Sequence, residues 1–226
     1  MMKNKQSGFS LIELGVVMFI IVLLLGSVLV PLQTQVEQRQ ISTTEKSLVE
    51  IREALLGFAI ANGYLPCPDT DNDGAENVNA GSGQCSTISS NISHGFLPWG
   101  TLGLGENDVW GNRFRYAVRE QYARRAPSTL FSLTTTAPNL RVCTAAGCAS
   151  TLTSTAVAVI LSHGKNSTTT AGSGSADEQE NSDADRDFVS RTITGPGAAA
   201  GEFDDVVTWL PIYVLYNRLV SAGKLP

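Results

Sequence analysis

A single carboxylate, Glu13, interrupts an otherwise apolar run from Phe9 to Leu32. Such a charge costs roughly 2.5–3.5 kcal/mol when the run enters a membrane, so it usually has a partner or a task. Glu13 lies near one end of the run, where its side chain could also reach the polar boundary. The chemistry that this position favours is pairing with a positive charge from another chain, because two buried charges are tolerated only together.

A first acidic stretch offers oxygen ligands for a hard cation. Asp69, Asp71 and Asp73 occupy alternate positions before a glycine, which matches the first half of a calcium loop. The glutamate that would close such a loop is missing, because Ala80 stands at its position. Glu76 or a backbone carbonyl is the expected substitute. The alternative is a solvated acidic turn.

A second acidic stretch extends from residue 177 to residue 205. Its candidate calcium ligands are Asp183, Asp185, Asp187, Asp204 and Asp205. By itself this stretch could equally be a solvated run of charge.

Composition and charge exclude several classes of protein. The chain has 226 residues, of which 42% are hydrophobic, and a formal net charge of −5. It is therefore not a globally basic nucleic-acid binder, and its length allows one large domain or two small ones. Apolar residues are concentrated in residues 9–32, whereas 66–108 and 162–202 are mostly small and polar. A purely soluble chain is not expected.

The amino terminus predicts a membrane-inserted helix with a defined orientation. Lys3 and Lys5 precede the apolar run, which is long enough to cross a bilayer. Because lysines stay on the cytoplasmic side, residues after about 33 are expected to be exported. The run is longer than the core of a secretory signal and lacks a small-residue cleavage site. On topology alone, the alternative is a simple membrane anchor.

The segment Gly8-Phe9-Ser10-Leu11-Ile12-Glu13-Leu14 resembles the processing site of type IV prepilins and type II secretion pseudopilins. The shared features are a short basic leader, glycine before the cut, phenylalanine after it, and glutamate as fifth residue of the mature chain. The resemblance implies cleavage between Gly8 and Phe9 by a prepilin peptidase and methylation of the new Phe9 amine. It also implies that Glu13 pairs with the terminal amine of a neighbouring subunit during assembly.

The same resemblance implies a location and a set of partners. The precursor would span the inner membrane once, in contact with its lipid, with its head in the periplasm. It would then join other pilin or pseudopilin subunits through the inner-membrane assembly platform. No cofactor is required, but major pseudopilins often bind calcium in loops after their strands, which favours a metal in the second acidic stretch.

The expected fold is α+β and pilin-like. A long N-terminal helix packs on a small antiparallel β-sheet head, which has long loops and a C-terminal helix. Apolar residues at helical spacing continue the helix to about residue 62, where Gly63 and Pro66 end it. We therefore expect a leader at 1–8, a helix at 9–62 with its membrane and filament-core part at 9–32, and a head at 63–226. The apolar stripe consists of Ile41, Leu48, Ile51, Leu55 and Phe58 or Ala59.

The sequence of the head, residues 63–226, predicts mostly β-structure. Strands are expected at 113–119, 155–161 and 203–209, with a weaker one at 130–134 and a helix at 212–220. The first strand should bury alternate apolar residues and expose its arginines. Residues 108–116 (Asp-Val-Trp-Gly-Asn-Arg-Phe-Arg-Tyr) resemble the strand entry of major pseudopilins. The head is longer than in many of them, which favours a minor or accessory subunit.

Four cysteines in an exported head predict disulfides. Local pairing gives Cys67–Cys85 and Cys143–Cys148, although crossed pairing stays open. A metal site is a poor alternative, because neither pair is spaced C-x-x-C and no histidine lies nearby.

These features predict a structural subunit of a type II secretion pseudopilus or a type IV pilus. The alternative is an anchored, pilin-like binding module for DNA or an exported substrate. DNA is not an expected partner, because no aromatic residues interleave with the arginines at 113–125. Enzymatic activity is not expected either, since His94 and His163 form no recognisable triad with a serine or cysteine.

Overall fold

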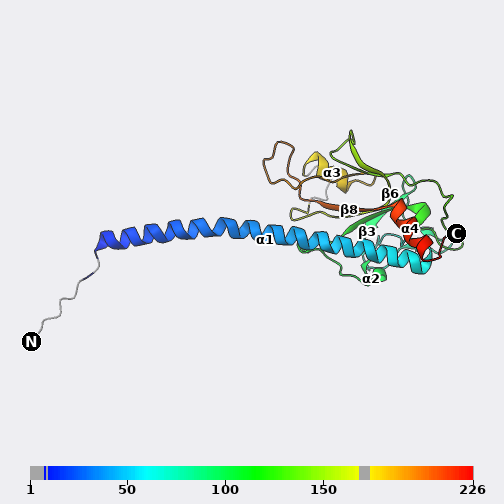
Figure 1. The fold of residues 1–226 in the computed structure, drawn as a ribbon, viewed down its shortest axis with the longest axis horizontal. Helices are drawn as coiled ribbons and strands as arrows, with labels where there is room; N and C mark the ends of the chain where they lie inside the picture. The colour runs from blue at the N-terminus through cyan, green and yellow to red at the C-terminus, as the bar shows by residue number, and fades with distance from the viewer. Residues whose placement is uncertain (1–7, 9, 168–173, 226) are drawn as a thin grey trace, which may run out of the picture. The chain divides into compact units, whose positions relative to one another are not determined.

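The computed structural model describes residues 8, 10–167 and 174–225, apart from the side chains of residues 27–33. Its contacts divide the chain into two units, Met1–Ser42 and Thr43–Pro226. Helix α1 (Leu11–Asn62) contributes residues to both units (Figure 1). We describe each unit by itself.

The first unit consists of the earlier part of α1. The helix begins directly after Ser10, whose hydroxyl accepts a hydrogen bond from the Ile12 N–H. Glu13 lies in the first turn, where a negative charge favours the partial positive charge of a helix N-terminus. The expected long N-terminal helix is therefore confirmed.

The second unit begins with the last part of α1, which has one buried face. Leu48, Ile51, Leu55 and Ala59 are each at most 2% exposed and belong to the main hydrophobic core. This is the face that the three- and four-residue spacing predicts. The helix ends at Asn62 as expected, because Gly63 adopts the left-handed conformation that glycine tolerates best.

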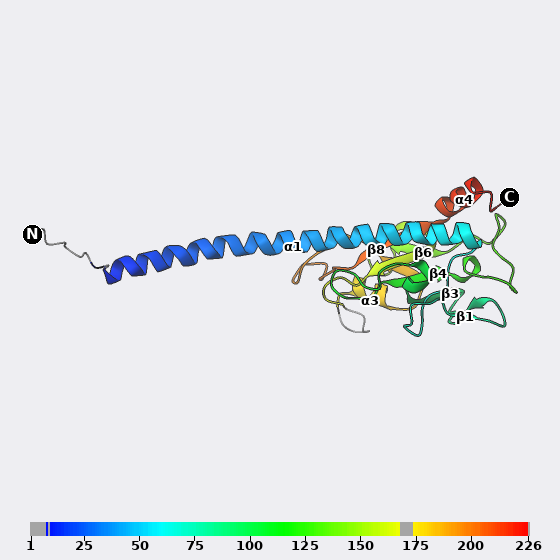
Figure 2. The ribbon, with the colours of Figure 1, turned by 90° about the horizontal axis from the view of Figure 1, so that it is seen from below.

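A six-stranded sheet forms the centre of the second unit (Figure 2). Its strands are β3 (Ile92–Phe96), β4 (Arg115–Arg119), β5 (Leu140–Cys143), β6 (Thr151–Ser162), β7 (Asp187–Val189) and β8 (Val206–Pro211). Ala158 of β6 pairs with Val118 and also with Leu210, so β4 and β8 flank the same central strand. The sheet is antiparallel except for the parallel pair β5–β7, which the sequence did not indicate.

Short elements complete the head. They are β1 (Val78–Asn79), β2 (Gln84–Cys85), α2 (Trp99–Leu102), the 3-10 turn Glu120–Tyr122, α3 (Ala176–Ser182) and α4 (Ile212–Ser221). Helix α4 is the predicted C-terminal helix. It buries Ile212, Leu215 and Leu219, and Arg218 reaches Glu53 of α1 at 3.5 Å.

The weakest predicted strand, at 130–134, is wrong. Phe131 is buried in the core, but the chain turns immediately after it. The Thr135 N–H donates to the Ser132 carbonyl, and the Ser132 N–H donates to the Thr135 hydroxyl. These local bonds compete with strand pairing, as serine and threonine side chains often do.

The prediction that β4 exposes its arginines is also wrong. Ala117 belongs to a second apolar cluster with Val142 and Phe188, so residues on both faces of β4 are packed. Arg119 is only 7% exposed and donates to the Ser90 carbonyl, while the Arg115 guanidinium lies 5.1 Å from the centre of the Phe96 ring. Strict alternation cannot reveal a second packed layer, because long arginine stems also cover apolar surface.

Candidate functional site

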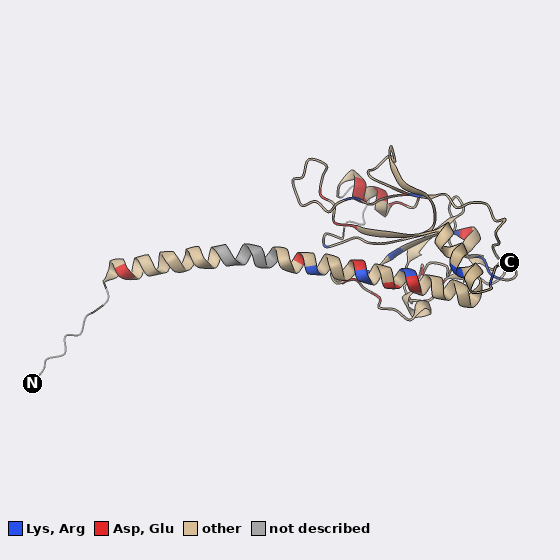
Figure 3. Ribbon diagram, in the orientation of Figure 1, with Lys and Arg blue, Asp and Glu red and all other residues tan. Residues whose placement is uncertain are grey.

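The structure places two of the three predicted processing and assembly residues in exposed positions. Gly8 and Glu13 are exposed, whereas Phe9 lies outside the described residues. Within the part of the chain that the structure describes, Glu13 has no ion-pair or hydrogen-bond partner. The next charged residue along the chain is Glu37 (Figure 3).

The helix around Glu13 presents apolar side chains in every direction. From Leu11 to Leu25 the large hydrophobic side chains are between 43% and 91% exposed. An all-round apolar helix is normally buried, either in other helices or in lipid. Over the residues whose placement is described, no helix combines the length and the mean hydropathy that a membrane span needs.

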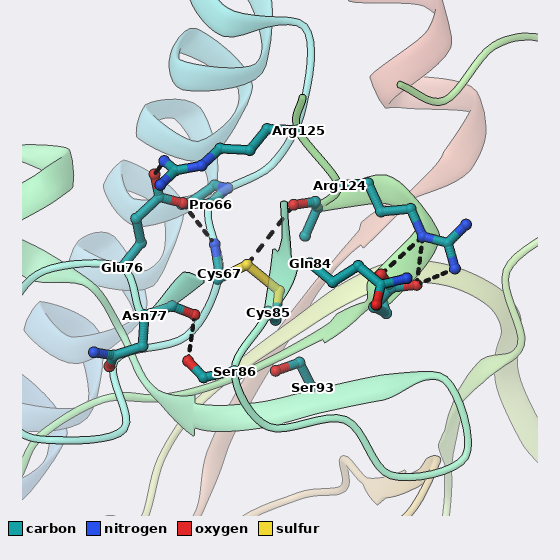
Figure 4. Close-up of a disulfide and its surroundings, with 12 residues drawn as sticks. Pro66, Cys67, Glu76, Asn77, Gln84, Cys85, Ser86, Ser93, Arg124 and Arg125 are labelled. Carbon is teal, nitrogen blue, oxygen red and sulfur yellow. Dashed lines mark hydrogen bonds and ion pairs between the residues drawn. A yellow bond between two sulfur atoms is a disulfide. The ribbon is translucent and has the colours of Figure 1, made fainter. Parts of the chain in front are cut away.

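A disulfide, Cys67–Cys85, organises the first polar region of the head (Figure 4). Both cysteines are buried, and Glu76 lies beside them. The Glu76 carboxylate accepts a hydrogen bond from the Cys67 N–H at 3.1 Å and pairs with Arg125 at 2.6 Å. Glu76 therefore holds this loop together, rather than lying free to close a calcium site.

The predicted first acidic loop folds around one buried carboxylate. Asp69 is 1% exposed and accepts hydrogen bonds from three backbone N–H groups. The donors are Asp71, Asn72 and Gly74, at 2.7–3.1 Å. Carboxylate oxygens of Asp69, Asp71 and Asp73 lie within 4.8 Å of one another. Asp71 and Asp73 are the exposed members and would supply most of the ligands to an ion held here.

Helix α2 fixes the same loop from the other side. Gly74 has a φ of +83°, and a Cβ atom there would lie 2.5 Å from the Trp99 ring. The Gly74 carbonyl accepts hydrogen bonds from the N–H groups of Gly100 and Thr101. The close approach of the Trp99 ring requires a residue without a side chain at position 74.

Replacing Gly74 with alanine should lower the free energy of unfolding by about 2–4 kcal/mol, because the new methyl group meets Trp99 and a positive φ is strained. Gly103→Ala is the matched control. Gly103 has a similar φ of +69°, but nothing lies within 4 Å of its Cβ position, so it should cost only about 1 kcal/mol. Urea unfolding followed by tryptophan fluorescence measures both. Equal losses would contradict the packing role of Trp99.

Calcium binding by the first acidic loop stays a prediction. Because the Trp99 ring contacts Gly74, its fluorescence should change on titration with calcium, and the melting temperature should rise by a few degrees. The double substitution Asp71→Asn with Asp73→Asn should remove both effects. The matched pair Asp183→Asn with Asp185→Asn should preserve them. A melting curve identical with calcium and with chelator would count against the prediction.

The second predicted acidic group is divided between two places. Asp187 forms a bidentate pair with Arg141, and its N–H donates to Asp185. Asp183 caps the end of α3, where burial, together with Asp185 and Glu180, raises its pKa to about 6. Among the described residues, neither Asp183 nor Asp185 belongs to a group of three or more potential metal ligands whose ligand atoms lie within 4.8 Å of one another.

Asp204 and Asp205 belong to a separate junction between β6, α3 and β8. Asp204 accepts a hydrogen bond from the Asn166 N–H at 2.8 Å, and burial raises its pKa to about 6. Asp205 is 2% exposed and accepts from the Asn181 amide, and its other oxygen lies 3.5 Å from the imidazole of His163. Burial also raises the pKa of Asp205.

Sequence reasoning missed most of the partners at this junction. Glu178 is fully buried and accepts from the Asn166 amide, and Ser162 donates to Asp108. The Asn112 amide donates to the Gly164 carbonyl at 2.7 Å. The resemblance of residues 108–116 to the strand entry of major pseudopilins was the available signal. The Ser162–Asp108 and Asn112–Gly164 hydrogen bonds together hold the segment before β4 against the end of β6.

The arginines at 113–125 face acidic groups or the protein interior. Arg113 pairs with Glu106, Arg124 with Glu120 and Arg125 with Glu76, each at 2.6 Å. The other two arginines lie on β4, where Arg115 packs over the Phe96 ring and Arg119 donates to the Ser90 carbonyl. This arrangement neutralises the charge inside the head and favours a structural role over contact with phosphate groups.

Comparison with known proteins identifies one region. Residues 3–29 match the family model of the prokaryotic N-terminal methylation motif, the prepilin-type cleavage and methylation signal. No curated protein and no solved structure shows significant similarity to the chain. The matched motif covers Gly8, Phe9 and Glu13, and it indicates a pilin-type precursor anchored in the inner membrane.

Proposed function

We propose that this chain, which carries a prepilin-type methylation motif, is a minor or accessory subunit of a type II secretion pseudopilus or a type IV pilus. The motif supports a subunit of the pilin or pseudopilin kind, and proteins with this signal are structural rather than enzymatic. A prepilin peptidase removes residues 1–8 and methylates the Phe9 amine. The processed chain then assembles with other subunits through its N-terminal helix.

The observation that carries this proposal is the exposed, all-apolar beginning of α1 with one carboxylate in its first turn. In a filament, neighbouring helices cover the apolar surface from Leu11 to Leu25, which is where the hydrophobic stabilisation of assembly arises. The methylated amine of a neighbouring Phe9 supplies a positive charge that pairs with the Glu13 carboxylate. Each of these charges would be costly to bury alone, and they are tolerated away from water because they form an ion pair.

Shearing of cells that produce the chain tests this proposal. We expect the processed protein in the sheared filament fraction, together with the other subunits of the machine. A protein that is found only in the membrane fraction, while filaments are present, would favour an anchored binding module instead.

The head is long and has many loops, so we propose an accessory position in the fibre, where this subunit is less abundant than the main subunit.

A further inference from the structure

The Cys143–Cys148 disulfide lies against two carboxylates that the proposed function does not use. The disulfide closes the connection between β5 and β6. Its Cys148 sulfur and carboxylate oxygens of Glu180 and Asp187 all lie within 4.8 Å of one another. We call Glu180 and Asp187 the acidic rim.

The acidic rim is held in place by the loop that the disulfide closes. The helix that carries Glu180 is tied to this loop, because Asp177 of the same helix accepts a hydrogen bond from the Ala146 N–H. Asp187 is oriented by its bidentate pair with Arg141. Asp187 therefore cannot simply turn away from the sulfur, and the helix that carries Glu180 is fixed beside the loop.

The two sulfur atoms differ in how they can be attacked. Cys143 is fully buried, whereas Cys148 is partly exposed. Cys148 is therefore the more accessible of the two cysteines to a thiolate, and the carboxylates of the acidic rim lie beside its sulfur. Repulsion between like charges slows such an approach when the site is partly shielded from water.

We propose that the acidic rim is an electrostatic guard that protects the Cys143–Cys148 disulfide from reduction by anionic thiols such as glutathione. In the guarded step, the glutathione thiolate attacks the Cys148 sulfur. A glutathione–Cys148 bond forms, the bond between Cys148 and Cys143 breaks, and its electron pair leaves on Cys143 as a thiolate. A second glutathione thiolate then releases Cys148 and forms oxidised glutathione, which balances the two-electron reduction.

The guard also explains why acidic residues gather beside a short disulfide loop. Two further carboxylates, Asp183 and Asp185, interact with Glu180, whereas Arg141 and Arg186 both pair with Asp187. Four carboxylates and two guanidinium groups therefore leave a net negative charge around Cys148. The other disulfide needs no such guard, because Cys67 and Cys85 are both buried.

Reduction kinetics of the purified full chain in detergent, with chelator present, test the proposal. Alkylation and mass spectrometry report each disulfide separately. With glutathione, Glu180→Gln should speed reduction of Cys143–Cys148 about five-fold and leave Cys67–Cys85 unchanged. With cysteamine, whose ammonium group balances its thiolate, the same variant should react no faster than the original chain. High salt should reduce the difference between the rates at which glutathione reduces this disulfide in the variant and in the original chain, because salt screens the charges.

Glutamine has nearly the same size and shape as glutamate, so this variant changes charge rather than loop structure. Glu45→Gln, which removes an exposed charge on α1, is the matched control and should leave both rates unchanged. Equal acceleration by glutathione and cysteamine would mean that the loop had loosened and would overturn the proposal. An unchanged glutathione rate would overturn it as well.

Discussion

Replacing Gly8 with leucine should leave the precursor uncut, so that the full-length chain accumulates and no methylated Phe9 appears. The peptidase must bring the backbone on both sides of the scissile bond into its active site, and a side chain before the cut blocks that approach. In the structure nothing lies within 4 Å of a Cβ atom at position 8, so the substitution does not disturb the fold. Immunoblotting and mass spectrometry of the N-terminal peptide measure the loss.

A matched control separates recognition from a general effect on the leader and helix. Gly15 is also free of contacts within 4 Å of its Cβ position, but it lies beyond the cut. Gly15→Ala should therefore be processed to the same extent as the original chain. Normal cleavage of the Gly8 variant would show that the cut site has been assigned to the wrong bond.

Replacing Glu13 with alanine should leave processing intact but reduce incorporation into filaments by more than ten-fold. The carboxylate is exposed and belongs to neither apolar core, so its removal does not destabilise the subunit. During assembly, however, the amine of the neighbouring Phe9 would be buried without its partner. Removing one member of a buried pair costs about 3–5 kcal/mol.

The measurement is the ratio of subunit in sheared filaments to subunit in membranes. Glu37→Ala is the matched control, because Glu37 is an exposed acid on the same helix and should incorporate normally. Glu13→Gln should fail like alanine, because an amide lacks the charge that stabilises the amine. Incorporation of the Glu13 variants at the original level would remove the pairing role.

Local patterns in the sequence were sufficient for the elements that do not depend on distant residues. The stripe of Leu48, Ile51 and Leu55 and the stop at Gly63 come from helix periodicity and glycine conformation, and both are confirmed. The strand predicted at 155–161 is likewise confirmed as part of β6, which is a central strand of the sheet. Such signals are readable because neighbouring residues in the chain determine them.

One prediction failed because local side-chain hydrogen bonds compete with strand pairing, and others failed because the partner lies in another element. Residues 130–134 look like a strand, but the hydroxyls of Ser132 and Thr135 form a turn. The parallel β5–β7 pair brings together segments that are far apart in the sequence. No local pattern indicates which distant strand will lie beside β5.

The amino-acid sequence by itself determined the processing motif, the long helix and the carboxylate near its start. The processing motif and this carboxylate act as a linear signal, read by an enzyme or by neighbouring helices, and both lie within residues 3–29. Only the tertiary structure decided what the acidic residues of the head do. Glu76 holds Arg125, Asp187 holds Arg141 and Asp205 faces His163, each across a long stretch of chain. A carboxylate acts according to the groups that folding places beside it, and spacing along the chain does not reveal those groups.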